Sequence, residues 1–419
     1  MSRASALPTA KLPPEIYALF VVRLVVSAGS FVGPFLTMIL TIKLGYADGA
    51  AGAFVSGVTV AGAVGLFAGG HLGDRLERAG VLRWLQAATA GIFLVCALVG
   101  FTPVTPFLMA AALVTLQGTW PLINALVADR APPERTKEAF ALIYWGNNIG
   151  FSIGPLIAGL LFDAAPRALF VGNAVALFIA AGVVGLFVRR PGAAPGGAQA
   201  AVAERAAEAT IVARPLSRKS ALVDALRRHP ILVLYGLSSV LGSFIYAQHS
   251  FALPVYLKDG LGPELGPKLF GSAMTTNGLT VVLLTSLVTL LSRRLPSLAA
   301  VSLSYLFYAA GFGGYALSLS ALPILGMTAL WTVGEILGAT NGNAFIAERS
   351  PPEFRARINS FISVCHVAGG AMGPLVAGAV SDARGSAAVW PFVAVLSLLS
   401  AGFSLFIYRG DTIRSSAKR

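Results

Sequence analysis

Long apolar segments recur along almost the whole of this chain. A helix needs roughly 20 mostly apolar residues to cross the hydrocarbon core of a bilayer. Twelve such segments are present, at about residues 16–44, 50–72, 83–101, 106–128, 137–162, 167–188, 230–257, 268–291, 297–318, 321–347, 356–381 and 387–408. Polar and apolar residues do not alternate within them, as they do in the strands of membrane barrels. The sequence therefore predicts an all-α membrane protein with twelve transmembrane helices.

The composition supports a lipid environment and excludes several other classes of protein. Hydrophobic residues make up 56% of the 419 residues and charged residues 12%, whereas soluble domains have about 25% charged residues. Cys96 and Cys365 lie far apart in apolar segments, so neither a disulfide framework nor a metal site is predicted, and no cofactor is expected. The first apolar segment is too long for a signal peptide and has no small-residue cleavage site, so we interpret it as a retained helix.

The basic residues are distributed unequally between the two sides of the predicted membrane protein. Of 31 Lys and Arg residues, 25 lie on the same side as the N-terminus, five lie on the opposite side, and Arg23 lies within the first apolar segment. Because cytoplasmic loops carry an excess of Lys and Arg, we predict a multi-pass protein of the bacterial inner membrane with both termini in the cytoplasm. The net charge is +13, but its scatter over short loops argues against nucleic acid as a partner.

A polar segment divides the chain, and the two parts repeat each other. Residues 189–229 are rich in Ala, Gly and Pro, which is typical of a linker. We predict a six-helix bundle over 1–188, a cytoplasmic linker over 189–229 and a second six-helix bundle over 230–419. NALVADRAPPE at 124–134 matches NAFIAERSPPE at 343–353, and GPLIAGLLFD at 154–163 matches GPLVAGAVSD at 373–382.

Both matches have the same offset of 219 positions, and 15 of the 40 residues from 124 to 163 are identical to their counterparts. We interpret this as an internal duplication. Two parallel halves with a site between them, near the middle of the membrane, are the plan of one large class of transporters.

A charged motif separates the second and third apolar segments. GGHLGDRLERAG at 69–80 fits the pattern G-x-L-x-D-R-x-x-R, and together with twelve segments and a central linker it resembles the major facilitator superfamily (MFS). The resemblance implies that Asp74 lies at the N-terminus of the eleventh helix, near 354–357, where free N–H groups favour an anion. Arg75 and Arg78 would then contact acidic residues such as Asp129 or Glu134.

These contacts would hold the two halves together on the cytoplasmic side. We call this the cytoplasmic latch and assign to it Gly70, Gly73, Asp74, Arg75, Arg78, Asp129 and Arg130. The latch would stabilise the outward-facing state and break when the cytoplasmic side opens. The alternative is a positively charged loop that only sets the topology, but Asp74 would then have no purpose.

Two charged residues are predicted within the membrane. Glu335 is the only acidic residue in the middle of a segment, where a charge costs about 2.5–3.5 kcal/mol. Because protonation removes most of that cost, we predict that Glu335 carries the coupled proton. Arg23 lies in the first segment and could bind an anionic substrate group, act on a nearby acid such as Glu335, or extend to the membrane surface. A permanent ion pair between Arg23 and Glu335 is the alternative structural interpretation.

Uncharged polar and aromatic residues recur in several of the predicted helices. In lipid, such polar side chains face the interior of the bundle, and an aromatic cavity with few charges suits an amphipathic ligand. Interhelical hydrogen bonding is the alternative, and for His249 and His366 a structural role is the commoner case. We predict a substrate cavity lined by Gln117, Asn124, Tyr144, Asn147, Asn148, Tyr246, Gln248, His249, Asn277, Trp331, Asn341 and His366.

The fifth segment carries small residues at fourfold spacing. Gly150 and Gly154 are followed by Pro155, and Gly373 and Pro374 repeat the arrangement in the eleventh segment. Small residues one turn apart allow close helix crossing, and proline permits a bend. G-x-x-x-G-P is similar to a signature of proton-driven antiporters in the family, but its repetition favours a packing role.

The resemblance implies a secondary transporter rather than an enzyme. Catalytic or nucleotide-binding motifs such as GxSxG, HExxH or a Walker sequence do not occur. We expect a monomer that exports a small amphipathic molecule in exchange for protons by alternating access. The alternative is a proton-coupled importer of peptides or another nutrient, although the E-x-x-E-R cluster of peptide symporters does not accompany Arg23. Val114 also occupies the position at which antiporters of this type commonly carry an arginine.

Overall fold

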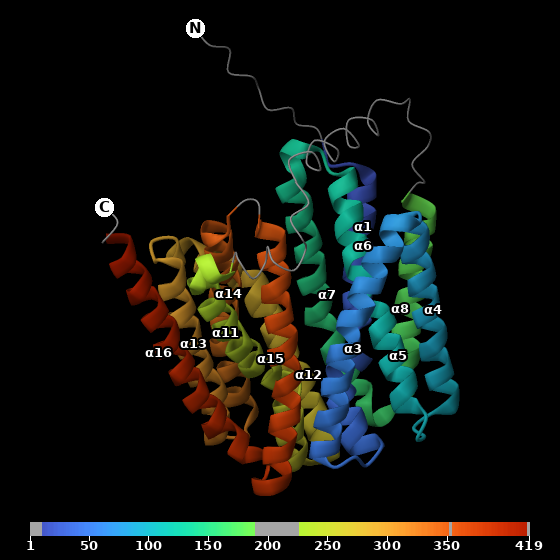
Figure 1. The fold of residues 1–419 in the computed structure, drawn as a ribbon. Coiled ribbons are helices and arrows are strands. Elements are labelled where there is room, and N and C mark those ends of the chain that lie inside the picture. Colours follow the sequence, from blue (N-terminus) through green and yellow to red (C-terminus); the bar gives the residue numbers. More distant parts are fainter. Residues whose placement is uncertain (1–10, 189–225, 352–353, 417–419) are drawn as a thin grey trace, which may run out of the picture.

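The computed structural model describes residues 11–188, 226–351 and 354–416, and the chain in these ranges folds into two bundles of helices (Figure 1). The predicted linker lies outside the described residues except for 226–229. The first bundle consists of α1 (Pro14–Ala28), α2 (Val32–Met38), η1 (Ile39–Lys43), α3 (Asp48–Arg75), α4 (Arg78–Val99), α5 (Thr105–Gln117), α6 (Thr119–Arg130), η2 (Pro133–Arg135), α7 (Thr136–Ala164) and α8 (Ala168–Phe187).

The second bundle follows the same plan. It consists of α11 (Pro230–Tyr246), η3 (Ala247–His249), α12 (Ala252–Ser292), α13 (Ser297–Gly314), η4 (Tyr315–Leu317), α14 (Ala321–Arg349), α15 (Arg355–Arg384), η6 (Ser386–Ala388) and α16 (Val389–Ser416). The start of α1, the end of α8, the start of α11 and the end of α16 lie on one face of the molecule, which we call the terminal face (Figure 1). The other end of the bundles is the opposite face.

Ten helical stretches in the described part of the chain are long and apolar enough to cross a membrane. One of them, Pro230–Ser292, has 63 residues, which is enough for two passages. A longer loop was expected between these passages, but two helical segments follow each other directly with a kink at Gly262. The φ angle of Gly262 is 78°, a backbone conformation that favours glycine. When this stretch is counted as two passages and α7, which is 29 residues long, is added, the described helices correspond to the twelve predicted segments.

The two bundles meet along two helix pairs, α3 with α15 and α7 with α12, and both crossings depend on glycine. A Cβ atom at Gly52 of α3 would overlap the carbonyl oxygen of Pro374 in α15, and one at Gly271 of α12 would overlap that of Pro155 in α7. The residues of one crossing are offset by 219 positions from those of the other. The internal duplication therefore places two equivalent backbone contacts at the bundle interface.

The glycines singled out in the fifth and eleventh segments pack within their own bundles. A Cβ atom at Gly150 or Gly154 would overlap backbone atoms of α1 at Leu24 and Ala28, and one at Gly373 would meet α11. The close packing of these glycines therefore attaches α7 and α15 to their own bundles, while Pro155 and Pro374 present carbonyl oxygens to the other bundle.

Candidate functional site

Glu335 lies at the centre of α14 and accepts hydrogen bonds from two neighbouring helices. The hydroxyl of Tyr246 in α11 donates to Oε1 at 2.9 Å, and the amide Nδ2 of Asn277 in α12 donates to Oε2 at 2.8 Å. The same amide lies 3.0 Å from Oγ1 of Thr332, one turn before Glu335. Hydrogen bonds donated to a carboxylate stabilise its charged form. Among the described residues, the hydrogen-bond partners of this carboxyl, Tyr246 and Asn277, are uncharged.

Aromatic rings surround this carboxyl. Trp331 is fully buried, and its ring centroid lies 6.1 Å from that of Tyr246 and 5.5 Å from that of His249. Glu335, Tyr246, Tyr308 and His366 line a cavity of about 250 Å³ within the second bundle. The structure therefore brings together six of the predicted site residues: Glu335, Tyr246, His249, Asn277, Trp331 and His366.

The imidazole of His249 is fixed by a backbone contact. Its Nδ1 lies 2.6 Å from the carbonyl oxygen of Tyr246, and because a carbonyl only accepts, Nδ1 carries the hydrogen. The neighbouring Gln248 is fully buried and donates to the carbonyl of Phe244. Both residues lie in the 3₁₀ turn that follows α11.

A second cavity, of about 350 Å³, lies mainly in the first bundle. Its lining includes Gln117 and Trp120, and Ser250 of the second bundle. The duplication places Val58, Leu113 and Leu116 at the positions of Asn277, Thr332 and Glu335, and all three apolar residues line this cavity. Three equivalent positions thus carry polar side chains in the second bundle and apolar side chains in the first, a difference that sequence reasoning missed although the offset was known.

Arg23 lies apart from Glu335. Its side chain is 3% exposed, and the guanidinium carbon lies 3.2 Å from the ring centroid of Trp120. Such cation–π contacts contribute about 0.5–2 kcal/mol. Nη2 has no hydrogen-bond partner within the described ranges, so the ion pair with Glu335 considered from the sequence is not formed in this structure.

The remaining predicted cavity residues have varied surroundings. Asn147 accepts a hydrogen bond from Ser27 at 2.9 Å, and Asn341 donates to the carbonyl of Leu337 in its own helix at 3.0 Å. These contacts are of the interhelical and intrahelical kind that were considered as alternatives to ligand binding. Tyr144 is 50% exposed and Asn124 is exposed, whereas Asn148 donates a hydrogen bond to the carbonyl oxygen of Tyr144 in its own helix.

The charged motif forms contacts within the first bundle. It was expected in a loop, but α3 continues through Asp74 to Arg75, and Gly73 packs against Leu122 of α6. Arg78 pairs with Asp129 at 2.5 Å and with Asp74 at 3.7 Å. Asp74 is 75% exposed, and Arg130 pairs with Glu15 of α1 at 3.8 Å. Arg75 is exposed, and so is His71, the residue that follows Gly70 in the motif.

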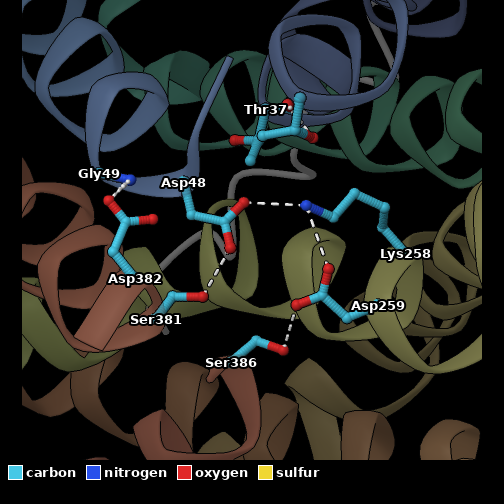
Figure 2. A network of polar contacts seen from close by, with 9 residues as sticks. Thr37, Asp48, Gly49, Lys258, Asp259, Ser381, Asp382 and Ser386 are labelled. Atoms are coloured by element: carbon cyan, nitrogen blue, oxygen red, sulfur yellow. Dashed lines mark hydrogen bonds and ion pairs between the residues drawn. The ribbon is translucent and has the colours of Figure 1, made fainter. Parts of the chain in front are cut away.

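A polar network on the opposite face connects the two bundles (Figure 2). Lys258 of α12 lies 2.9 Å from Asp48, the first residue of α3, and 3.1 Å from Asp259. Ser381 of α15 donates to Asp48 at 2.6 Å, and the backbone N–H of Gly49 donates to Asp382 of α15 at 3.0 Å. Sequence reasoning missed this network because its residues lie at helix ends, and nothing in their spacing indicates that the ends meet.

The fold and the site together define a membrane transporter built of two related helical bundles. A carboxyl lies in one bundle, and the bundles contact each other through the pairs α3–α15 and α7–α12. The family model of the Major Facilitator Superfamily matches residues 18–341. The chain therefore belongs to the Major Facilitator Superfamily, as expected from the motif, and it is a transporter rather than an enzyme.

Several known proteins are similar to the chain. An uncharacterized MFS-type transporter, YhjO of Bacillus subtilis, is 26% identical over 382 residues, which cover 90% of this chain and 88% of the relative. A Na(+), Li(+), K(+)/H(+) antiporter of Planococcus maritimus is 25% identical over 331 residues, covering 73% and 76%.

Solved structures share the fold at lower identity. A POT family transporter in complex with a thioalcohol conjugated peptide has a TM-score of 0.76 at 17% identity, covering 95% of this chain and 98% of that one. The nucleoside transporter NupG has a TM-score of 0.73 at 14% identity, covering 94% and 99%. These likenesses support the architecture of two bundles.

Proposed function

We propose that this transporter exports small amphipathic molecules in exchange for protons, and that Glu335 is the group that binds the coupled proton. The observation that carries the proposal is the surroundings of this carboxyl. It lies at the middle of α14, and Tyr246 and Asn277 donate hydrogen bonds to it without neutralising its charge. A proton can therefore supply the missing positive charge.

The two cavities support an amphipathic substrate. The cavity beside Glu335 offers hydroxyl and carboxyl groups, whereas the cavity of the first bundle offers the apolar side chains of Val58, Leu113 and Leu116 beside polar groups such as that of Gln117. A molecule with a polar end and an apolar end would place each end against one bundle. Rocking of the bundles would then change the surroundings of both ends at once, which is what alternating access requires.

The structure has the contacts expected of an inward-facing state, if the terminal face is cytoplasmic. Asp48, Lys258 and Asp382 connect the bundles at the opposite face. On the terminal face, the ion pairs Arg78–Asp129 and Arg349–Asp411 each lie within one bundle. We infer that the cytoplasmic latch is disengaged here and that Asp74 engages α15 in the outward-facing state.

The test is proton-coupled transport in proteoliposomes with an acidic lumen and a pH-sensitive dye inside. Adding an amphipathic cation outside should make the lumen more alkaline, because antiport releases a proton for each molecule taken up. Glu335→Gln should abolish the signal while retaining ligand binding. Glu348→Gln, at the end of the same helix, should transport normally. Unchanged exchange in Glu335→Gln would contradict the proposal.

Exchange of monovalent cations for protons is a second candidate. It is favoured by the antiporter of Planococcus maritimus, whose name states that it exchanges Na⁺, Li⁺ and K⁺ for protons. The oxygens of Glu335 and Thr332 are hard ligands of the kind such ions prefer. In the same vesicles, alkalinisation on adding NaCl or KCl would favour this candidate. Acidification on adding peptides would instead indicate proton-coupled import, the alternative drawn from the sequence.

A further inference from the structure

The helix pair α3 and α15 carries a carboxylate at each end that can contact the other helix. On the opposite face, Oδ2 of Asp382, in the last turn of α15, accepts a hydrogen bond from the N–H of Gly49 at 3.0 Å (Figure 2). Gly49 is the second residue of α3, a helix of 28 residues. Free N–H groups and the helix dipole favour an anion at this position.

The two helices are antiparallel, and their register can be followed from contact to contact. Ser56 donates to the carbonyl oxygen of Ala371 at 2.5 Å, and Thr59 lies beside Gly370. Asp74 lies 15 residues after Thr59, and Arg355 lies 15 residues before Gly370. Continued along both helices, the register therefore places Asp74 opposite Arg355, the first residue of α15.

In this structure only one of the two contacts is made. Asp382 is bonded to the start of α3, whereas the side chain of Asp74 is 75% exposed and pairs with Arg78 of its own bundle. Val64 and Phe67, in the half of α3 toward the terminal face, are 65% and 66% exposed. The close contacts described above lie in the other half of the helix pair, so closing the terminal face requires α3 and α15 to rock about them.

We propose that Asp382 is the counterpart of Asp74, so that each carboxylate holds one end of the pair α3–α15 by binding the N-terminus of the other helix. The two contacts exclude each other because rocking that closes one end opens the other. Asp382 stabilises the state seen here, with Asp48 and Lys258 reinforcing it, and Asp74 stabilises the reverse state. The inference rests on the proposed alternating access, but not on proton coupling or on the identity of the substrate.

The test is a pair of distance measurements between spin labels in the full chain, without substrate, after Cys96 and Cys365 are replaced by serine. One pair of labels, at Val104 and Leu322, reports the opposite face, and another, at Leu76 and Leu295, reports the terminal face. All four positions are exposed, between 42% and 82%.

Asp382→Asn should shift the ratio of the two states by roughly two- to fivefold toward opening of the opposite face, which is the usual effect of a charge at a helix terminus. The Val104–Leu322 distance should lengthen and the Leu76–Leu295 distance should shorten. Asp74→Asn should shift the ratio in the other direction, and the double variant should lie between the two. High salt should reduce each shift, because it screens charge–dipole interactions.

Asp163→Asn is the matched control. Asp163 is the counterpart of Asp382 under the 219-residue offset, but it pairs with Lys43 of its own bundle at 3.6 Å, so the distances should not change. If Asp382→Asn does not fold, Gly49→Ala provides a second test, because its Cβ would overlap Oδ2 of Asp382 without changing any charge.

Gly49→Ala should open the opposite face in the same way. Distances in Asp382→Asn and Gly49→Ala that match those of the control would overturn the proposal. The expected distance changes in Asp382→Asn and Asp74→Asn, together with unchanged proton exchange in Glu335→Gln, would instead support this proposal and contradict the proposed proton site.

Discussion

At the scale of single residues, Glu335 and Arg23 show two ways of keeping a charge inside a membrane protein. Glu335 receives hydrogen bonds from Tyr246 and Asn277, whereas Arg23 is stacked on Trp120 and retains a guanidinium nitrogen without a partner among the described residues. A buried ionic group without a partner is costly. A buried Arg23 guanidinium with one nitrogen unpaired in the described part of the chain therefore favours a role in binding an anion over a role in stability.

Arg23→Gln is therefore expected to affect transport selectively. Transport of anionic test ligands should fall at least tenfold, because a hydrogen bond between charged groups contributes about 1.5–3 kcal/mol, whereas transport of cationic ligands should change little. Uptake of matched anionic and cationic dyes into proteoliposomes measures the difference. Arg83→Gln, at an exposed arginine of α4, is the control. Equal losses for both dyes would indicate that Arg23 has a structural role.

At the scale of helices, the bundle interface depends on close backbone contact rather than on large side chains. Gly52 lies against the carbonyl of Pro374, and Gly271 lies against that of Pro155. Ser56 adds a hydrogen bond to the carbonyl of Ala371. Apolar side chains gain little by associating in lipid, so tight packing and such hydrogen bonds hold helices together there.

Gly52→Ala should weaken the α3–α15 crossing. The added Cβ would overlap the Pro374 carbonyl, and overpacking of this kind costs about 1–3 kcal/mol. Thermal unfolding in detergent should show a lower midpoint, and transport should slow. Gly57→Ala in the same helix is the control, because no atom lies within 4 Å of its added Cβ. That variant should be as stable as the wild type or more stable. Equal midpoints for both variants would show that the crossing tolerates separation.

At the scale of the whole molecule, the duplication gives two bundles with similar backbones and different chemistry. Asn277, Thr332 and Glu335 in one bundle correspond to Val58, Leu113 and Leu116 in the other. The described ends of both bundles lie on one face (Figure 1). The excess of Lys and Arg on that side predicts that it faces the cytoplasm.

Labelling of single cysteines tests this orientation. In intact cells without Cys96 and Cys365, a membrane-impermeant maleimide should label Glu264→Cys, on the opposite face, because that face is predicted to lie outside. Leu295→Cys, between α12 and α13, should be labelled only after the membrane is opened. Both native positions are exposed. Labelling in the reverse order would invert the predicted topology.

The sequence by itself determined the family, the all-helical membrane fold and the presence of a single carboxyl in the middle of an apolar segment, because each depends on local properties. Apolar length, the motif around Asp74 and the isolation of Glu335 are all visible along the chain. The family match and the structural neighbours confirm the fold, while the roles of Glu335, Arg23 and Asp74 stay predictions.

Only the tertiary structure decided which groups meet. Tyr246 and Asn277 reach Glu335 from two other helices, Arg23 stacks on Trp120, and Asp382 reaches the start of α3 from a position 333 residues away. Hydrophobic periodicity places a residue in the membrane, but it does not specify which helices are neighbours. That choice depends on the packing of glycines such as Gly52 and Gly271 against distant backbone, which is a property of the assembled bundles.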